Sequence, residues 1–322
     1  MNKLTIYPSC ARYFRSFIDS YGEKDKKFMN KYVTRLLKVK PFDVTLRDGL
    51  QGLSKEQQLT MKPVDMLNLY FQIKEKYQPR NMEIGSIVSS KVLPIFKNSD
   101  SFYNYIEYCQ LNPDEPKINN FILIPNETQF NNINKFIGLN CFSFITSVSE
   151  SFQMKNTKMT LDTTFQQINN MMRVLDDKPE KSTVKLYVSC INECPIEGKI
   201  DNNVIIEKIQ KYQKLKPDIL CLSDTCGTLT SEDLNYIILN LQRDGIKNDY
   251  SNLSLHLHVK PGREDEVEKI IHTALDFGIN SFDVSTLKSG GCSVTMNESD
   301  LAPNLSYELY YKSLATYLLK DK

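Results

Sequence analysis

The sequence predicts an α/β fold, a (β/α)8 TIM barrel with an N-terminal helical extension. From Pro41 onward, short β-rich runs alternate with longer stretches of helical periodicity. Eight such units fill roughly 280 residues, close to the ~250 residues usual for this architecture. Polar side chains follow many different β-rich runs, and a barrel gathers such strand ends at one mouth. A doubly wound open sheet is the alternative that the same alternation allows.

The predicted strands are the β-rich runs, each of which ends in polar or charged residues. They are expected at Phe42–Leu46, Met82–Ile84, Phe121–Ile124, Cys141–Ile145, Lys185–Ser189, Asp218–Leu222, Leu253–His258 and Ser281–Val284. Between them, apolar residues recur at three- and four-residue spacing, which predicts helices. The clearest of these are Val64–Tyr77, Thr163–Leu175, Val204–Leu215, Ser231–Leu241 and Glu264–Phe277. Thr160, Asp201 and Thr230 precede three of them and are expected to cap their first turns.

The N-terminal residues 1–40 lie outside these units, so we expect two parts: a helical extension at 1–40 and the barrel at 41–322. Ala11–Ile18 and Phe28–Leu37 are amphipathic and should pack on the barrel as helices. The segment holds ten Lys/Arg and three Asp/Glu. That excess could mark a mitochondrial presequence, but the acidic residues and the scarcity of Ser favour a solvated basic helix. A cytoplasmic protein is therefore expected rather than a mitochondrial one.

Composition excludes several classes of function. The 322 residues are 41% hydrophobic, with 40 basic and 39 acidic side chains and a net charge of +1. This balance argues against an electrostatic grip on nucleic acid or on an anionic membrane. No run approaches the ~18 to 20 apolar residues that span a bilayer, and neither GxxxxGK[ST] nor GxGxxG follows a predicted strand. A soluble, intracellular protein without nucleic-acid or membrane partners is expected, and nucleotide-dependent chemistry has no support.

The eight cysteines look like dispersed, reduced thiols, because neither the chain length nor their spacing suits a disulfide framework. Cys190 and Cys194 are four residues apart, as in a zinc half-site. No second Cys/His pair at finger spacing follows them, so a structural zinc is not expected.

Two of the three histidines, His256 and His258, fall in a run where apolar and polar residues alternate. In a strand they share one face with Ser254, while the intervening leucines share the other. Two neighbouring imidazoles suggest a metal site, although a chance pair on a solvated sheet face gives the same pattern.

Six segments resemble 3-hydroxy-3-methylglutaryl-CoA lyase and the wider group of divalent-metal barrel lyases and Claisen synthases with a pyruvate carboxyltransferase-like domain. They follow one another in the family's order over about residues 41–314. The segments are Thr45–Gln51 (TLRDGLQ), Glu83–Ser90 (EIGSIVSS), Tyr187–Ile200 (YVSCINECPIEGKI), Leu222–Gly227 (LSDTCG), His256–His258 (HLH) and Gly290–Cys292 (GGC). Tyr187–Ile200 and Gly-Gly-Cys resemble the lyase in particular, since the synthases usually carry a Gly-x-Gly-Glu-Arg type loop there.

The resemblance implies a divalent cation held by Asp48, His256 and His258, with a fourth ligand after the Gly-Gly-Cys loop. Asn304 and Asp300 compete for this place. We choose Asn304, because it would also make a good N-cap for the final helix. Mixed oxygen and nitrogen ligands fit Mg²⁺ or Mn²⁺ better than a closed tetrahedral zinc site.

Catalytic roles are also implied by the resemblance. Arg47 would stabilise an enolate oxygen, but it faces the same pocket as Asp48 only if the strand end twists or bulges. Cys292, on a glycine-flanked loop, would donate a proton to the enolate carbon. Glu83 and Asp224 would bind the substrate or orient the imidazoles, although Asp224 could equally cap a turn. The general base would be Asp48 or His256.

The activity implied is cleavage of 3-hydroxy-3-methylglutaryl-CoA, or a similar 3-hydroxy-acyl-CoA, into acetyl-CoA and a keto acid such as acetoacetate. The alternatives are a Claisen synthase or aldolase of the same fold, and a non-catalytic metal-binding barrel acting as a scaffold. Residues 259–265 and 293–298 depart from the family's pattern, so the surroundings of the histidines and the substrate could differ. A homodimer is one assembly that the resemblance allows.

Overall fold

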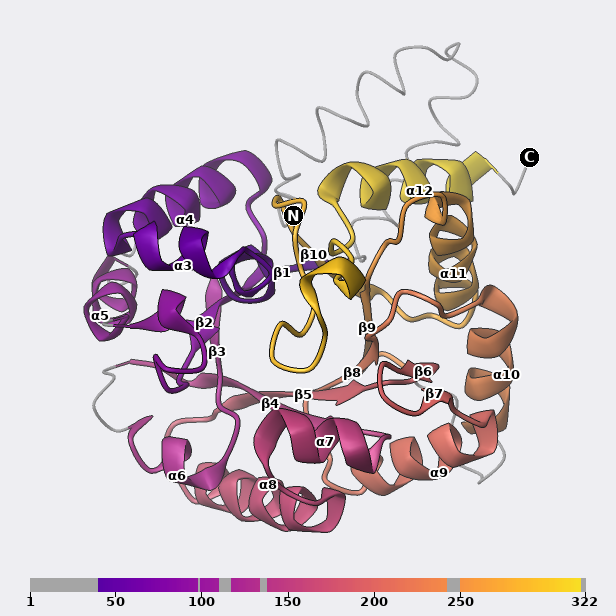
Figure 1. The fold of residues 1–322 in the computed structure, drawn as a ribbon, viewed down its shortest axis with the longest axis horizontal. Coiled ribbons are helices and arrows are strands. Elements are labelled where there is room, and N and C mark those ends of the chain that lie inside the picture. The colour runs from indigo at the N-terminus through magenta and orange to yellow at the C-terminus, as the bar shows by residue number, and fades with distance from the viewer. Residues whose placement is uncertain (1–39, 98, 110–116, 134–137, 242–249, 320–322) are drawn as a thin grey trace, which may run out of the picture.

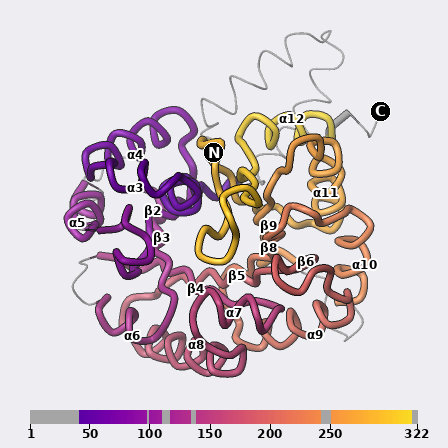
Figure 2. Tube along the Cα trace, in the orientation of Figure 1, coloured from indigo at the N-terminus to yellow at the C-terminus, as the bar shows by residue number. Residues whose placement is uncertain are grey.

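The computed structural model describes residues 40–97, 99–109, 117–133, 138–241 and 250–319. Eight parallel strands close into a barrel in the order β1-β10-β9-β8-β5-β4-β3-β2, which confirms the predicted fold and excludes the open sheet. Helices surround this ring on the outside (Figures 1 and 2). The amphipathic pieces expected at Ala11–Ile18 and Phe28–Leu37 lie outside the described residues.

The barrel strands agree with the sequence prediction to within a few residues, except the first. Their bounds are β1 Lys40–Asp43, β2 Asn81–Ser86, β3 Asn119–Leu123, β4 Cys141–Ser147, β5 Thr183–Ser189, β8 Ile219–Asp224, β9 Leu253–Leu257 and β10 Ser281–Val284. A separate antiparallel hairpin joins β6 (Glu193–Cys194) to β7 (Gly198–Lys199). The strand expected to run through Leu46 ends at Asp43, because the chain turns there into a π-helical segment, Thr45–Gly49.

The helices include all five that the periodicity predicted. Their bounds are α3 Lys55–Thr60, α4 Pro63–Tyr77, α5 Asp100–Cys109, α6 Glu127–Phe130, α7 Glu150–Thr157, α8 Leu161–Asp176, α9 Asn202–Gln213, α10 Ser231–Leu241, α11 Glu264–Asp276 and α12 Tyr307–Leu319, with 3-10 turns at Pro94–Phe96 and Glu298–Asp300. Thr160, Asp201 and Thr230 accept backbone N–H groups of their first turns, as expected. Asn304 does not cap α12; Ser306 does, since its hydroxyl accepts the N–H of Leu309.

Strand alternation divides the buried residues into two layers. Along β5, Val184, Leu186 and Val188 belong to the apolar layer shared with the outer helices. The alternate residues Lys185 and Tyr187 are also buried, and both contact Asp283 of β10 across the barrel. The barrel interior is therefore polar toward the mouth, which is where the chemistry is expected.

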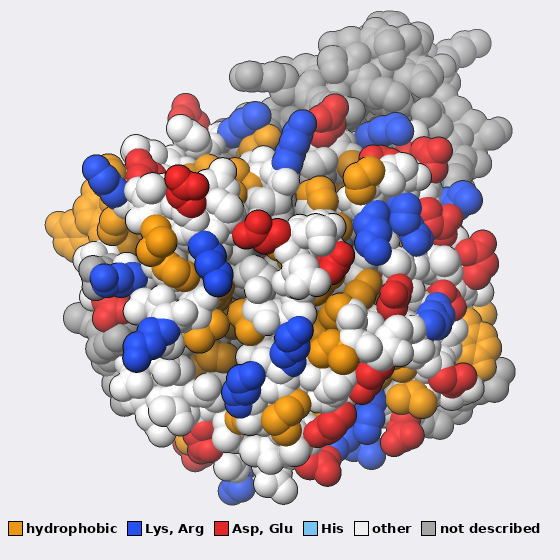
Figure 3. Space-filling model, in the orientation of Figure 1, with side chains coloured by type: hydrophobic (Ala, Val, Ile, Leu, Met, Phe, Trp, Pro, Cys, Tyr) orange, Lys and Arg blue, Asp and Glu red, His pale blue; other side chains and the backbone are white. Residues whose placement is uncertain are grey.

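No helix within the described ranges is long and apolar enough to cross a membrane. On the mouth face, acidic and basic side chains are interspersed (Figure 3), as the small net charge implies.

Candidate active site

A wide turn after β1 brings Arg47 and Asp48 to the mouth together. Neighbours on a strand point to opposite faces, but the π-helical turn, closed by a hydrogen bond from Gly49 N to Val44 O of 3.1 Å, removes both residues from the strand. Both side chains are buried and line one pocket. Arg47 was expected to face the same pocket as Asp48 only if the strand end twists or bulges, and this turn provides that change of direction.

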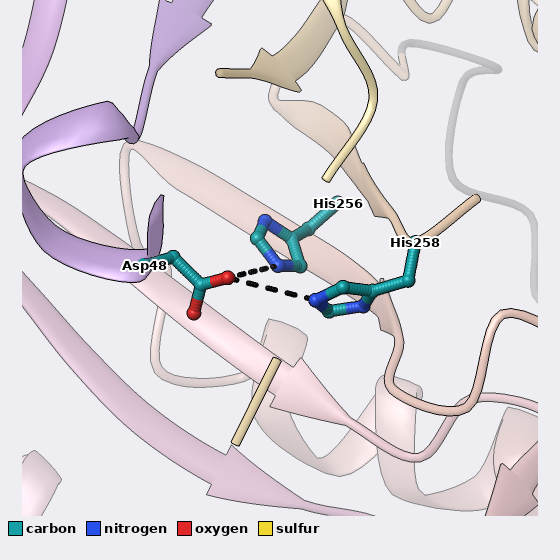
Figure 4. A group of neighbouring side chains, drawn as sticks. All are labelled: Asp48, His256 and His258. Atoms are coloured by element: carbon teal, nitrogen blue, oxygen red, sulfur yellow. Dashed lines mark ion pairs between the residues drawn. The ribbon is translucent and has the colours of Figure 1, made fainter. Parts of the chain in front are cut away.

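Three ligand atoms converge on one point of this pocket (Figure 4). Asp48 Oδ2 lies 3.5 Å from His258 Nε2 and 3.8 Å from His256 Nε2. The three atoms all lie within 4.8 Å of one another, and each residue is buried. One candidate cation site is therefore formed by the Asp48 carboxylate, after the first strand, and by the two imidazoles at the end of β9.

Hydrogen bonds behind the rings fix which imidazole nitrogen faces Asp48. His258 Nδ1 lies 2.9 Å from the backbone oxygen of Asp224, which can only accept, so Nδ1 carries the proton. His256 Nδ1 lies 2.9 Å from Asp283 Oδ2. The Nε2 atoms are left to face Asp48, the orientation that metal-binding histidines usually have.

The electrostatics of the triad keep the carboxylate ionised. Burial tends to raise the pKa of Asp48, but the Arg47 guanidinium and the two imidazoles hold that pKa well below its ordinary value. Burial lowers the pKa of His256. For His258, burial acts in the same direction, but the nearby Asp48 carboxylate raises its pKa above the ordinary value. A negative oxygen facing two imidazole nitrogens is a donor set suited to a divalent cation.

Asn304 lies beside His258, and Asp300 does not. The Asn304 backbone forms a bridge with His258, and its Nδ2 donates to Ser289 O at 3.2 Å. Its Oδ1 and His258 Nε2 are both buried without a hydrogen-bond partner among the described residues. Asp300 is exposed and bonded to Asn297 and Ser299. A buried imidazole nitrogen that faces only the Asp48 carboxylate, beside a residue whose amide oxygen has no hydrogen bond, is what a site shaped for a cation would leave, so the residues present fit the metal.

Glu83 stands behind Arg47 and orients it. Its Oε2 accepts Arg47 Nε at 2.6 Å and the Tyr187 hydroxyl at 3.0 Å. Arg47 Nη1 also contacts Asp48 Oδ1 at 2.5 Å. The guanidinium is therefore fixed by two carboxylates in a buried place, where its charge acts strongly on a neighbouring oxygen.

The Asp224 side chain caps a turn, which is the alternative weighed from the sequence. Its carboxylate accepts the N–H groups of Thr228 and Leu229 at 3.0 and 3.1 Å, which caps the turn after β8. Its backbone oxygen, not its carboxylate, orients His258. Asn126, another strand-end residue, caps α6.

Sequence reasoning missed Asp283 and its partners Lys185 and Tyr187. Asp283 Oδ1 pairs with Lys185 Nζ at 2.5 Å, and Oδ2 accepts the Tyr187 hydroxyl at 3.0 Å. The signal was present in the sequence, because a lysine in the middle of a buried strand needs a buried acid as a partner.

Cys292 lies on the loop after β10 and lines the same pocket as Arg47, Asp48, His256 and His258. Burial raises the pKa of its thiol, so the thiol keeps its proton at neutral pH. A Cβ on Gly52 would lie 2.3 Å from Gly290 N, which shows how closely the loop packs on the chain after β1. Cys190 and Cys194 are buried and are not part of the candidate metal group found among the described residues.

No protein-family model matches the chain. Among curated proteins it is 25% identical over 256 residues to hydroxymethylglutaryl-CoA lyase of Pseudomonas mevalonii, covering 79% of this chain and 78% of that protein. It is 27% identical over 256 residues to the mitochondrial hydroxymethylglutaryl-CoA lyase of Mus musculus, covering 79% and 72%.

Solved structures agree in fold. The hydroxymethylglutaryl-CoA lyase of Pseudomonas aeruginosa superimposes with a TM-score of 0.71 at 22% identity, covering 88% of this chain and 85% of that one. An HMG-CoA lyase from Acinetobacter baumannii, in complex with coenzyme A and 3-methylmalate, gives a TM-score of 0.65 at 21% identity, covering 87% and 89%.

Proposed function

We propose that this chain, a hydroxymethylglutaryl-CoA lyase-like enzyme, cleaves 3-hydroxy-3-methylglutaryl-CoA or a similar 3-hydroxy-acyl-CoA to acetyl-CoA and acetoacetate or another keto acid, in a divalent-metal-dependent retro-Claisen reaction. The observation that carries the proposal is the convergence of Asp48, His256 and His258 in one buried pocket with Arg47 and Cys292. The coenzyme A bound to the Acinetobacter protein supports an acyl-CoA as the substrate class.

Asp48, His256, His258 and Asn304 would hold the cation, Mg²⁺ or Mn²⁺. When bound, such an ion supplies Lewis acidity that lowers the pKa of a coordinated hydroxyl and fixes its orientation. His258 Nε2 and Asn304 Oδ1, which are buried and make no hydrogen bond among the described residues, support this assignment. The hydroxyl proton would pass to Asp48 or His256, the two candidates for general base.

The remaining residues serve the enolate that forms when the carbon-carbon bond breaks. Arg47, held by Glu83 and Asp48, would neutralise charge on the thioester oxygen, which is typically worth about 3 to 4 kcal/mol of barrier when the donor is preorganised. Cys292, whose thiol keeps its proton, would deliver that proton to the enolate carbon. Asp224 and Asp283 would keep the imidazoles oriented.

The test is an assay of acetoacetate release from 3-hydroxy-3-methylglutaryl-CoA with Mn²⁺, with Mg²⁺ and after chelation. We expect activity that depends on the metal and falls by more than about 100-fold in His258→Ala, because changes behind a ligand already cost about 10- to 100-fold. The matched control is Asp300→Ala. Asp300 is an exposed acid that follows Cys292 closely in the sequence, and its replacement should leave activity unchanged.

Activity absent with every metal would reject the lyase proposal, whereas activity that survives chelation would reject only the metal. Consumption of acetyl-CoA with a keto acid, without cleavage of the acyl-CoA, would identify a synthase. Binding of a partner that is lost on removal of residues 1–40, with no chemistry at all, would identify a scaffold.

We also propose that residues 1–40 form a helical extension of the barrel at 41–322 and that the protein is cytoplasmic rather than mitochondrial, with a homodimer as the assembly to be tested. Light scattering measures the assembly, and fractionation of a tagged full-length chain measures the compartment. A monomer, or recovery in mitochondria, would reject the corresponding part.

A further inference from the structure

The last turn of α7 contacts the loop that carries Cys292, which is defined here as residues 285–297. Asn156 Oδ1 accepts the Cys292 thiol at 3.5 Å, and Lys155 Nζ donates to the backbone oxygen of Thr295 at 2.9 Å. In Figure 1 this loop, between β10 and α12, crosses the mouth of the barrel toward α7. Two neighbouring residues of one helix therefore hold the Cys292 loop at two points.

The helix is the fixed partner in these contacts. Its N-terminus is capped by Ser149, whose Oγ accepts the N–H of Phe152 at 3.0 Å and donates to Cys194 Sγ at 3.1 Å. Phe152 is buried, and Gln153 Nε2 bonds to Thr164 at the start of α8. These contacts tie α7 to the β6–β7 hairpin and to α8.

The backbone of the loop next to Cys292 is held, but the thiol itself needs a partner. Gly291 adopts a φ of 93°, in the left-handed region that favours glycine, and its N–H donates to Asp48 Oδ2 at 3.0 Å. Cys292 follows this residue directly, and its side chain can adopt more than one staggered rotamer on that backbone. A hydrogen bond from the thiol to a group on α7 selects one of these positions.

We propose that Asn156 is a positioning residue for the Cys292 thiol, and that Lys155 anchors the same loop through the backbone oxygen of Thr295. The inference rests on the function proposed above for the role of the thiol, although the geometry stands without it. A thiol that donates to a fixed amide oxygen has one preferred rotamer and a retained proton. Asn156 and Cys292 both line the pocket, so this hydrogen bond lies at the candidate active site.

The test measures how fast iodoacetamide alkylates Cys292 in substrate-free protein, with mass spectrometry of the peptide that contains it. Asn156→Leu, close in size but without the acceptor, should raise this rate about three- to tenfold, the population change expected for loss of one hydrogen bond. Asn156→Asp keeps an acceptor and adds a charge that disfavours the thiolate, so its rate should equal or fall below that of the unmodified protein. Equal rates in all three proteins would overturn the proposal.

A second pair of variants keeps the test decisive if Asn156→Leu fails to fold. Lys155 and Lys158 are both exposed lysines at the end of α7. Lys155 contacts the loop, whereas Lys158 makes no hydrogen bond or ion pair with its described residues. Lys155→Met should raise the alkylation rate about twofold or more, and Lys158→Met should not change it. Equal effects of the two substitutions would overturn the anchoring role.

Activity provides the separate readout. In an active enzyme Asn156→Leu should lower kcat with little change in KM, because the thiol acts after the substrate is bound. The predicted alkylation pattern in a protein without lyase activity would reject the proposed function and leave the positioning role intact. Lyase activity without that pattern would reject the positioning role alone.

Discussion

The buried carboxyl group of Asp43 couples the stability of the barrel to pH. Its Oδ1 accepts the N–H of Thr45 at 2.9 Å, and its Oδ2 accepts the hydroxyls of Thr45 and Tyr307, each at 3.0 Å. Asp43 thereby ties the end of β1 to the start of α12. Burial raises its pKa from 3.8 to about 7, despite these hydrogen bonds.

The sign of the effect follows from the two states. In the unfolded chain Asp43 ionises near pH 3.8, whereas in the folded protein it stays protonated up to about pH 7. Between these values the folded state binds more protons than the unfolded state. The free energy of unfolding is therefore highest at low pH and falls as pH rises through this window. A shift of about three units corresponds to about 4 kcal/mol at about 1.36 kcal/mol per unit, an order-of-magnitude cost that persists above pH 7.

We predict that Asp43→Asn removes this cost, because the amide is neutral and still offers an acceptor to Thr45. Between pH 5 and pH 8 the variant should gain about 3 kcal/mol of unfolding free energy over the unmodified protein. Urea unfolding at the two pH values measures the difference. The control is Asp177→Asn at an exposed carboxylate, which should track the unmodified protein. An Asp43→Asn variant with the same pH dependence as the unmodified protein would refute the reasoning.

Substitutions at the metal centre and its loop give three more predictions. Asn304→Ala should weaken Mn²⁺ binding by about tenfold or more in a calorimetric titration, whereas Asp300→Ala should not; equal effects would remove Asn304 as the fourth ligand. Asp283→Asn should weaken the same binding by about 10- to 100-fold, and an unchanged affinity would mean that Asp283 does not orient His256. Gly52→Ala would place a Cβ 2.3 Å from Gly290 N and should speed alkylation of Cys292, with circular dichroism as the check of folding; an unchanged rate would contradict the close packing.

The barrel could be predicted from the sequence because its strands and its helices have clearly different hydrophobic periodicities. Leu253–His258 illustrates this, since alternation alone placed His256 and His258 on one face, and both imidazoles turn toward Asp48. The predicted end of the first strand was wrong. Phe42–Leu46 is a β-rich run, but the π-helical turn after Asp43 depends on contacts with residues far away in the sequence. Such contacts have no local signal.

The same limit explains the errors around the site. Asn304 was chosen partly as an N-cap of the last helix, but α12 begins at Tyr307 and Ser306 caps it. Asp283 was missed because the buried Lys185 indicates a buried acid without indicating which one, and the sequence does not reveal that Asp283 lies beside His256 on the next strand and faces Lys185 across the barrel. Pairings between strands depend on closure of the sheet, which a periodicity does not contain.

The claim that Asp48, His256 and His258 share one divalent cation is tested most directly by titrating Mn²⁺ into the protein and following the electron paramagnetic resonance signal of the free ion. The account predicts one bound Mn²⁺ per chain, and an affinity at least about 100-fold weaker in Asp48→Asn. An unmodified protein that leaves the free-ion signal unchanged, or an Asp48→Asn variant that binds as tightly, would contradict it.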